Sequence, residues 1–279
     1  MRFGISTRLY HDRRLERGHL EQIGSYGFDA IELFATRRHF DYHDEAAIAA
    51  LGGWLSEVGL TLNSVHAPIS TSGSRENRGE TFSNAAADNA RRQAAVAETA
   101  AALRIARTIP FDVLVVHLGS PAITSQTGDN TPAAAFRSAE EICRLAEPFG
   151  VRVALEVIPN ALSTAGELVA MLEGNLDAPH AGICLDFGHA HLMGEVADAV
   201  ETAAEHVIAT HVHDNRRLQD DHLVPYRGSI DWDLALMTMQ KIGYDGTYLL
   251  ELANTGSAAS VLEEAQRARQ RFERTLTHP

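Results

Sequence analysis

The segment Cys184–His191, which reads Cys-Leu-Asp-Phe-Gly-His-Ala-His, holds the residue types best suited to chemistry. The apolar run Ala181–Ile183 precedes it, so a buried strand is predicted to end at the Asp186 carboxylate, with His189 three residues further on. Strands of a parallel sheet are apolar on both faces, so the first charged residue marks the point where the strand leaves the core. Carboxylate and imidazole together are ligands of zinc, manganese and related divalent ions. The alternative is that Asp186 only caps a helix and that His189 is incidental.

The composition narrows the class of protein. Of the 279 residues, 45% are hydrophobic, which is ordinary for a globular protein with a large core. Lys and Arg number 24 against 37 Asp and Glu, a net charge of −13, so a dedicated nucleic-acid-binding protein with a basic surface is not expected. The chain shows neither a secretory signal nor a stretch of the roughly 18 apolar residues that span a membrane. Its two cysteines, Cys143 and Cys184, lack metal or redox spacing. We therefore expect a cytoplasmic protein that binds no membrane, and association of the chain with itself is left open.

Short apolar strand patterns alternate with helical patterns along the whole chain. The predicted strands are Phe3–Ser6, Ala30–Leu33, Leu62–His66, Val113–His117, Arg152–Glu156, Ala181–Asp186, Ile208–His213 and Thr247–Glu251. The predicted helices lie near residues 15–26, 44–58, 84–107, 132–149, 165–173, 195–205, 232–242 and 258–276, and long polar loops are expected at 67–83 and 118–130. Eight strand–helix units close a (β/α)₈ barrel, whereas a doubly wound sheet usually has fewer strands and a glycine-rich first turn. The pattern predicts an α/β protein, with a single (β/α)₈ TIM barrel domain over residues 1–279.

Carboxylates and imidazoles lie at or next to the ends of nearly all predicted strands. In chain order the strand-end residues are Ser6, Glu32, His66, His117, Glu156, Asp186, His211 with His213, and Glu251. A barrel built only for stability has no need of such side chains at the carboxyl ends of its strands, which is where active sites of this fold lie. One such residue could simply face a polar loop. The convergence of the whole set on one rim instead favours an active site.

Several of these segments resemble the xylose-isomerase-like TIM barrel superfamily. They are Leu155–Asn160, Cys184–His191, His211–Asn215 and Leu250-Glu251, together with Asp220–Pro225 and Gly228–Trp232, which are similar to an insertion before the seventh helix of that superfamily. The superfamily contains sugar and sugar-phosphate isomerases and epimerases, inosose dehydratases, and zinc-dependent apurinic endonucleases. The resemblance covers nearly the whole chain, and it implies a fold and a metal site more specifically than a reaction.

The resemblance also implies a set of metal ligands, namely Glu156, Asp186, His211 and Glu251. Three carboxylates and one imidazole suit Mn²⁺, Mg²⁺ or Co²⁺, and Zn²⁺ is compatible with them. The endonuclease pattern has further ligands whose counterparts here are His66, His117, His189, Asp220 and His222. One divalent ion is the first expectation, and a two- or three-zinc cluster is an open alternative.

Substrate contacts follow from the same resemblance. His189 corresponds to a substrate-contacting histidine of the isomerases, and Arg217 to a substrate-binding arginine of the ketose 3-epimerases; Glu32 and His213 are further candidates. Those epimerases carry an extra Glu where this chain has Leu162, which argues against an epimerase of that particular type. The basic, DNA-intercalating loops of an endonuclease are not found.

The predicted chemistry is proton transfer beside a carbonyl. Isomerising or epimerising a sugar removes a proton from carbon, and a divalent ion that bridges the carbonyl and the adjacent hydroxyl stabilises the enediolate. Glu156 and Glu251 are the catalytic candidates that remove and return the proton, with His189 or water as the alternative. The prediction is a metal-dependent isomerase or epimerase of a small sugar or sugar phosphate. An inosose-dehydratase-like lyase and a multi-zinc phosphodiesterase of the endonuclease kind stay open. If the substrate is phosphorylated, its phosphate is expected at Asn254–Ser257, before the last helix.

Overall fold

The computed structural model describes residues 2–71, 79–174 and 176–277, and within these ranges eight parallel strands form a barrel that closes in chain order. The strands are β1 (Arg2–Ser6), β2 (Ala30–Phe34), β3 (Thr61–His66), β4 (Val113–Val116), β5 (Arg152–Glu156), β6 (Ala181–Asp186), β7 (Val207–Val212) and β8 (Thr247–Leu250). Strand β1 pairs with both β2 and β8, which closes the sheet. The predicted (β/α)₈ fold is confirmed, and each predicted strand boundary is correct to within one residue. His117, His213 and Glu251 therefore lie one residue beyond their strands, and residues 72–78 of the predicted 67–83 loop lie outside the described ranges.

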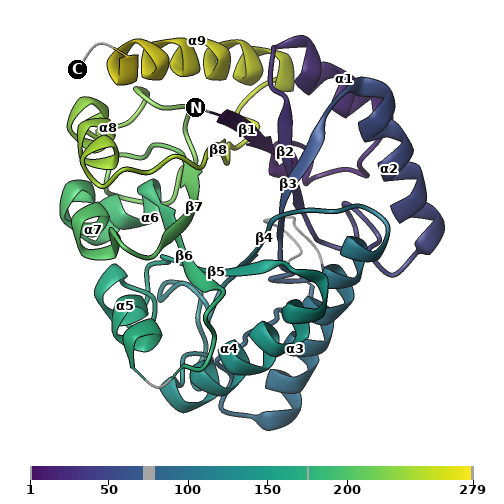
Figure 1. The fold of residues 1–279 in the computed structure, drawn as a ribbon, viewed down its shortest axis with the longest axis vertical. Helices are drawn as coiled ribbons and strands as arrows, with labels where there is room; N and C mark the ends of the chain where they lie inside the picture. The colour runs from purple at the N-terminus through teal and green to yellow at the C-terminus, as the bar shows by residue number, and fades with distance from the viewer. Residues whose placement is uncertain (1, 72–78, 175, 278–279) are drawn as a thin grey trace.

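Helices surround the barrel, as Figure 1 shows. They are α1 (Arg17–Ser25), α2 (Glu45–Val58), α3 (Asn89–Leu103), α4 (Pro132–Ala146), α5 (Ala165–Glu173), α6 (Phe187–Met193), α7 (Val196–Ala203), α8 (Trp232–Lys241) and α9 (Ala258–Thr277), with short 3₁₀ helices η1 (Thr7–Tyr10), η2 (Arg104–Arg107) and η3 (Glu147–Phe149). Among the described residues, none of these helices has the length and apolar character needed to cross a membrane.

Two helices differ from the sequence pattern, and a capping aspartate accounts for each. Helix α3 begins at Asn89 instead of near residue 84, because the Asp88 carboxylate accepts a hydrogen bond from the Arg91 N–H at 2.8 Å. Helix α6 was not predicted, since its seven residues are too few to show a clear apolar period. Its cap is Asp186, which accepts a hydrogen bond from the His189 N–H at 2.7 Å.

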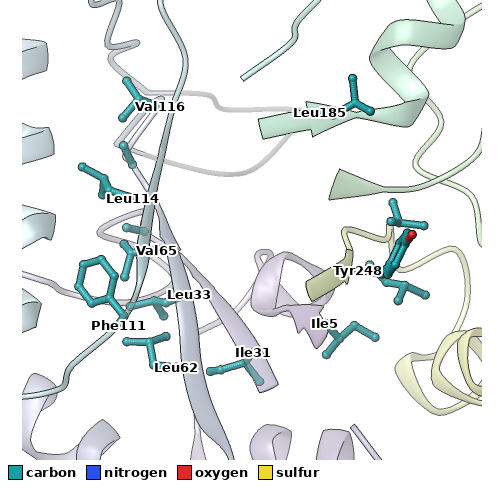
Figure 2. Close-up of a cluster of buried hydrophobic side chains, with 14 of the residues drawn as sticks. Ile5, Ile31, Leu33, Leu62, Val65, Phe111, Leu114, Val116, Leu185 and Tyr248 are labelled. Carbon is teal, nitrogen blue, oxygen red and sulfur yellow. The ribbon is translucent and has the colours of Figure 1, made fainter. Parts of the chain in front are cut away.

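The main hydrophobic core lies between the barrel and the surrounding helices. Strand side chains alternate between the two faces of the sheet, so neighbours such as Leu33 and Glu32 point in opposite directions. Figure 2 shows outward-facing members of this core, among them Leu33, Val65 and Leu114, all of them fully buried. Burial of each large aliphatic side chain contributes about 1.5–3 kcal/mol to stability. This layer holds the strands in register and so fixes where their carboxyl ends lie.

The barrel interior is filled differently. A separate small cluster of apolar side chains occupies it, formed by Val113, Val115, Ala154, Cys184 and Ala209. Bulky branched residues usually fill this space in a TIM barrel. Here two valines share the space with two alanines and a cysteine, and the positions nearer the carboxyl ends of the strands carry carboxylates and imidazoles.

His39 makes the stability of this fold depend on pH. Burial lowers its pKa from 6.5 to about 4; the Nδ1 atom lies 2.8 Å from the Arg13 carbonyl, and the Nε2 atom has no hydrogen-bond partner in the described structure. Between about pH 6.5 and pH 4, His39 is therefore protonated in the unfolded chain but not in the folded chain. This difference has no effect above about pH 6.5 and lowers the unfolding free energy as the pH falls towards 4. The unfolding free energy of wild type should fall between pH 7 and pH 5 by about 2 kcal/mol more than that of His39→Gln, as measured by urea denaturation. Equal losses in the two proteins would contradict this assignment.

Candidate metal centre

Four of the predicted ligands converge at the carboxyl ends of neighbouring strands. Glu156 ends β5, Asp186 ends β6, His211 lies on β7, and Glu251 follows β8. The pairing register places Asp186 directly beside His211. One donor atom from each of the four side chains lies within 4.8 Å of those of the others, and all four residues are buried. We call these residues the first group.

The Nδ1 atom of His211 faces all three carboxylates of the first group. It lies 3.0 Å from Glu156 Oε1, 3.9 Å from Asp186 Oδ2 and 3.8 Å from Glu251 Oε2. Three carboxylates this close together repel one another in a buried environment unless a cation lies between them. The donor set and its geometry therefore fit a divalent metal ion.

A second group adds to the same glutamate His66, which ends β3, and His117, which follows β4. The Nε2 atoms of His117 and His66 lie 2.9 Å and 3.2 Å from Glu156 Oε2. Within the described structure, His117 Nε2 and Glu156 Oε2 are buried and make no hydrogen bond despite this short separation. A nitrogen and an oxygen that lie this close together without forming a hydrogen bond are arranged as two ligands of one cation would be. Glu156 would then belong to both groups and bridge them, because Oε1 faces the first group and Oε2 faces the second.

A third group forms beside the first, from His189, His213, Asp220 and His222. Asp220 Oδ2 lies 2.9 Å from His222 Nε2 and 3.3 Å from His189 Nε2. The buried atoms His213 Nδ1 and Asp220 Oδ1 make no hydrogen bond to any described residue. His213 was predicted only as a substrate contact, whereas here it stands among potential metal ligands.

The insertion that carries Asp220 and His222 is organised by the buried carboxylate of Asp214. That carboxylate accepts hydrogen bonds from the backbone N–H groups of Asn215, Tyr226 and Ile230 and from Trp232 Nε1, at 2.9–3.2 Å. His222 itself adopts a left-handed backbone conformation with φ of 47°, which is costly for a residue with a side chain. The hydrogen bonds of Asp214 therefore offset the backbone strain at His222, a conformation that directs the His222 imidazole towards the third group.

The charges of these groups depend on one another. Burial alone raises the pKa of Glu156, but His117 and His211 outweigh it and hold that pKa well below its ordinary value. For Glu251, burial likewise raises the pKa, yet His211 and His222 lower it to about 2. Burial lowers the pKa of His189, and the nearby carboxylates Asp186 and Asp220 raise it well above its ordinary value. Glu156 and Glu251 are therefore ionised at neutral pH, and a metal ion that enters the centre would displace protons from the histidines.

Asp186 caps helix α6, and its carboxylate also faces the centre, so the cap and the predicted role as a metal ligand do not exclude each other. Its Oδ1 atom caps α6 through the His189 N–H, while its Oδ2 atom lies 3.2 Å from His189 Nδ1 and 3.0 Å from His213 Nε2. The cap thus fixes the carboxylate that faces the centre.

Two of the predicted substrate contacts, Arg217 and Glu32, have protein partners in this structure, and their contact with a substrate stays a prediction. Arg217 pairs with Glu195 at 2.6 Å, and its side chain is 44% exposed. Glu32 is fully buried, and its carboxylate contacts His211, Ser6 and Ser64.

Arg8 lies beside the centre and was not predicted. It follows β1 on η1, its Nε atom is 3.8 Å from Glu251 Oε1, and its side chain is only 19% exposed. Its Nη1 atom is buried without a hydrogen-bond partner among the described residues. Arg8 lies two residues past a predicted strand end, at the same rim as the ligands, and that position is the sequence signal that could have found it.

The predicted phosphate position forms part of a small cavity. Thr255, Gly256 and Ser257 line a space of about 120 Å³ with Arg227, whose guanidinium pairs with Glu264 at 2.9 Å. The location of a substrate phosphate there stays a prediction.

Gly188 allows His213 to reach the centre. A Cβ atom at position 188 would overlap the His213 imidazole, so Gly188→Ala must displace that ring from Asp186. We expect a loss of about 1–3 kcal/mol in unfolding free energy and weaker metal binding at the third group, measured by urea denaturation and metal titration. Gly166→Ala is the matched control, since Gly166 is also the second residue of its helix and its Cβ would meet nothing within 4 Å. Equal behaviour of the two variants would contradict the packing argument.

Comparison with known proteins agrees with the fold. The family model for the xylose isomerase-like TIM barrel matches residues 20–274. Protein MJ1311 of Methanocaldococcus jannaschii is 29% identical over 271 residues, covering 94% of this chain and 87% of that protein. The inosose isomerase of Bacillus subtilis is 26% identical over 134 residues, covering 45% of this chain and 48% of that enzyme. A crystal structure of a D-tagatose 3-epimerase-like protein superposes with a TM-score of 0.80 at 25% identity, covering 99% of this chain and 97% of that one. The chain belongs to the xylose isomerase-like TIM barrel family.

Proposed function

We propose that this protein is a divalent-metal-dependent isomerase or epimerase of a small carbohydrate. The observation that carries the proposal is the first group, in which three buried carboxylates surround His211 Nδ1 at the carboxyl end of the barrel. The names of two similar proteins, an inosose isomerase and a D-tagatose 3-epimerase-like protein, support a carbohydrate substrate.

The proposed chemistry assigns a role to each side chain. A divalent ion held by Glu156, Asp186, His211 and Glu251 would supply positive charge where negative charge develops on the substrate oxygens. Glu251 and Glu156 remove a proton from the substrate carbon and return it, since both are ionised and both lie at the centre.

Substrate binding is assigned to residues beside the first group. His189 is buried next to the centre, and a hydrogen bond from its Nε2 atom to a substrate oxygen requires that this atom first leave Asp220 Oδ2, which lies 3.3 Å away. The free N–H groups of Arg8 Nη1 are suited to a carbonyl or an anionic oxygen of the substrate. For Arg217, a direct substrate contact requires that it first leave Glu195.

A multi-zinc phosphodiesterase is the second candidate, and the second and third groups favour it. A chain that needed one ion for proton transfer has no evident use for His66, His117 and the cluster around Asp220. Together the groups provide ligands for two or three zinc ions, a number that suits stabilisation of the attacking and leaving oxygens of a phosphodiester.

The test is a substrate panel supplied to the metal-loaded protein. It contains free ketoses and aldoses, their phosphates, inososes and an oligonucleotide with an abasic site. Interconversion of a sugar pair supports the proposal, loss of water from an inosose indicates the lyase, and strand cleavage indicates the phosphodiesterase. A faster reaction with a sugar phosphate than with the free sugar would support a phosphate at Asn254–Ser257.

A further inference from the structure

Glu32 lies below the first group, on the side facing the middle of the barrel. Its side chain points inward from β2, and its contact with His211 on β7 crosses the barrel interior. Its Oε1 atom accepts a hydrogen bond from Ser6 Oγ at 3.1 Å, and its Oε2 atom accepts one from Ser64 Oγ at 3.0 Å. The same Oε2 atom lies 3.0 Å from His211 Nε2. Three neighbours on different strands thus fix the position of one buried carboxylate.

These contacts determine which nitrogen of His211 keeps its proton when a metal ion binds. Nε2 lies 3.0 Å from Glu32 Oε2 and Nδ1 lies 3.0 Å from Glu156 Oε1. A carboxylate oxygen offers no proton, so without a metal ion both nitrogens donate. An ion held by Glu156, Asp186 and Glu251 would displace the Nδ1 proton and leave the Nε2 proton in its hydrogen bond to Glu32. The lone pair of Nδ1 is then the only one that the ring can offer to a metal ion, and Nδ1 is the atom that faces Glu156, Asp186 and Glu251. A carboxylate behind a metal-ligating histidine fixes the tautomer and the ring orientation and increases the basicity of the ligand nitrogen.

We propose that Glu32 is a positioning residue for the metal site: it holds His211 as the Nε2–H tautomer with Nδ1 directed at the ion, and it does not contact the substrate. The inference rests on the proposed metal at the first group, but on no particular reaction.

The space below Glu32 decides which substitutions are informative. A cavity of about 280 Å³ lies in the lower barrel, and Glu32, Ser64 and His211 belong to its lining. Truncation of Glu32 to Ala would enlarge this cavity and lower stability for reasons of packing alone. Glu32→Gln keeps the volume but removes the negative charge. Ser64→Ala leaves the glutamate in place and removes one of the hydroxyl groups that hold it.

The experiment measures metal affinity of the folded proteins, not turnover. Wild type, Glu32→Gln, Glu32→Ala and Ser64→Ala are titrated with Co²⁺ against a chelator, and the visible absorption of the bound ion reports its coordination. Removing a residue of this kind typically weakens metal binding 10- to 100-fold, so we expect about 10-fold for Glu32→Gln, about 100-fold for Glu32→Ala and a smaller loss for Ser64→Ala. The Co²⁺ spectrum of both Glu32 variants is expected to change.

Glu98→Gln is the matched control for loss of a mostly buried carboxylate. Glu98 on α3 accepts hydrogen bonds from Tyr42 and Arg37 and lies in none of the three groups. Its variant should unfold at a lower temperature but keep the wild-type metal affinity and Co²⁺ spectrum. Folded Glu32 variants that match wild type in affinity and spectrum would overturn the inference alone. A wild-type protein that takes up no Co²⁺ would overturn both the inference and the proposed function.

Discussion

Glu251→Gln is expected to slow the incorporation of solvent deuterium into the substrate by 10²–10⁴-fold, the usual contribution of a well-placed general base. Isomerisation, epimerisation and dehydration all begin by breaking a C–H bond, so substrate incubated with the enzyme in D₂O gains deuterium beside the carbonyl when the transferred proton exchanges with solvent. The amide keeps an oxygen near the ion but cannot accept the proton. Mass spectrometry of the recovered sugar measures the rate.

Metal content has to be measured in the same samples, because Glu251 also belongs to the first group. Glu98→Gln serves again as the control and should exchange at the wild-type rate. Unchanged exchange in a metal-loaded Glu251→Gln protein would remove Glu251 as the base and favour His189 or water. Cleavage of the abasic oligonucleotide, with no carbon-bound deuterium for any sugar in the panel, would favour the phosphodiesterase.

Glu156→Ala is expected to abolish metal binding at the first and second groups together. Glu156 Oε1 faces His211 and Oε2 faces His66 and His117, so one truncation removes a ligand from both groups and leaves the histidines without a bridging carboxylate. The third group contains no atom of Glu156 and should keep its affinity. Elemental analysis of the dialysed protein, with wild type and Asp220→Ala beside it, measures the number of bound ions.

Asp220→Ala should show the reverse pattern, with loss confined to the third group. If the two variants lose the same ions, the three groups act as one cluster and the separation argued above is wrong. Retention of every ion in Glu156→Ala would contradict the bridging role of Glu156.

The fold and the convergence of the ligands could be predicted because both follow from one geometric rule. In a closed parallel barrel all strands end at the same rim, so polar residues at strand ends meet even when they are far apart in sequence. Glu156, Asp186, His211 and Glu251 are brought together in this way. The apolar patterns that locate their strands were sufficient to place each strand boundary within one residue.

Other features depend on side-chain direction and loop conformation, which an apolar pattern does not report. Glu32 is a glutamate near a strand end, like two of the predicted ligands, but its side chain lies deeper in the barrel, below His211. Arg217 matches a substrate-binding position of the family. In this structure its backbone is left-handed, with φ of 62°, and its guanidinium pairs with Glu195. Arg8 was missed because it lies on a short 3₁₀ helix, which leaves no clear period in the sequence.

The central claim is that the first group binds a divalent metal ion, and anomalous X-ray diffraction from crystals equilibrated with Mn²⁺ or Zn²⁺ tests it most directly. The expected result is an anomalous peak within bonding distance of His211 Nδ1 and of one oxygen each from Glu156, Asp186 and Glu251. Metal-saturated crystals that show no peak among these four side chains would contradict the claim.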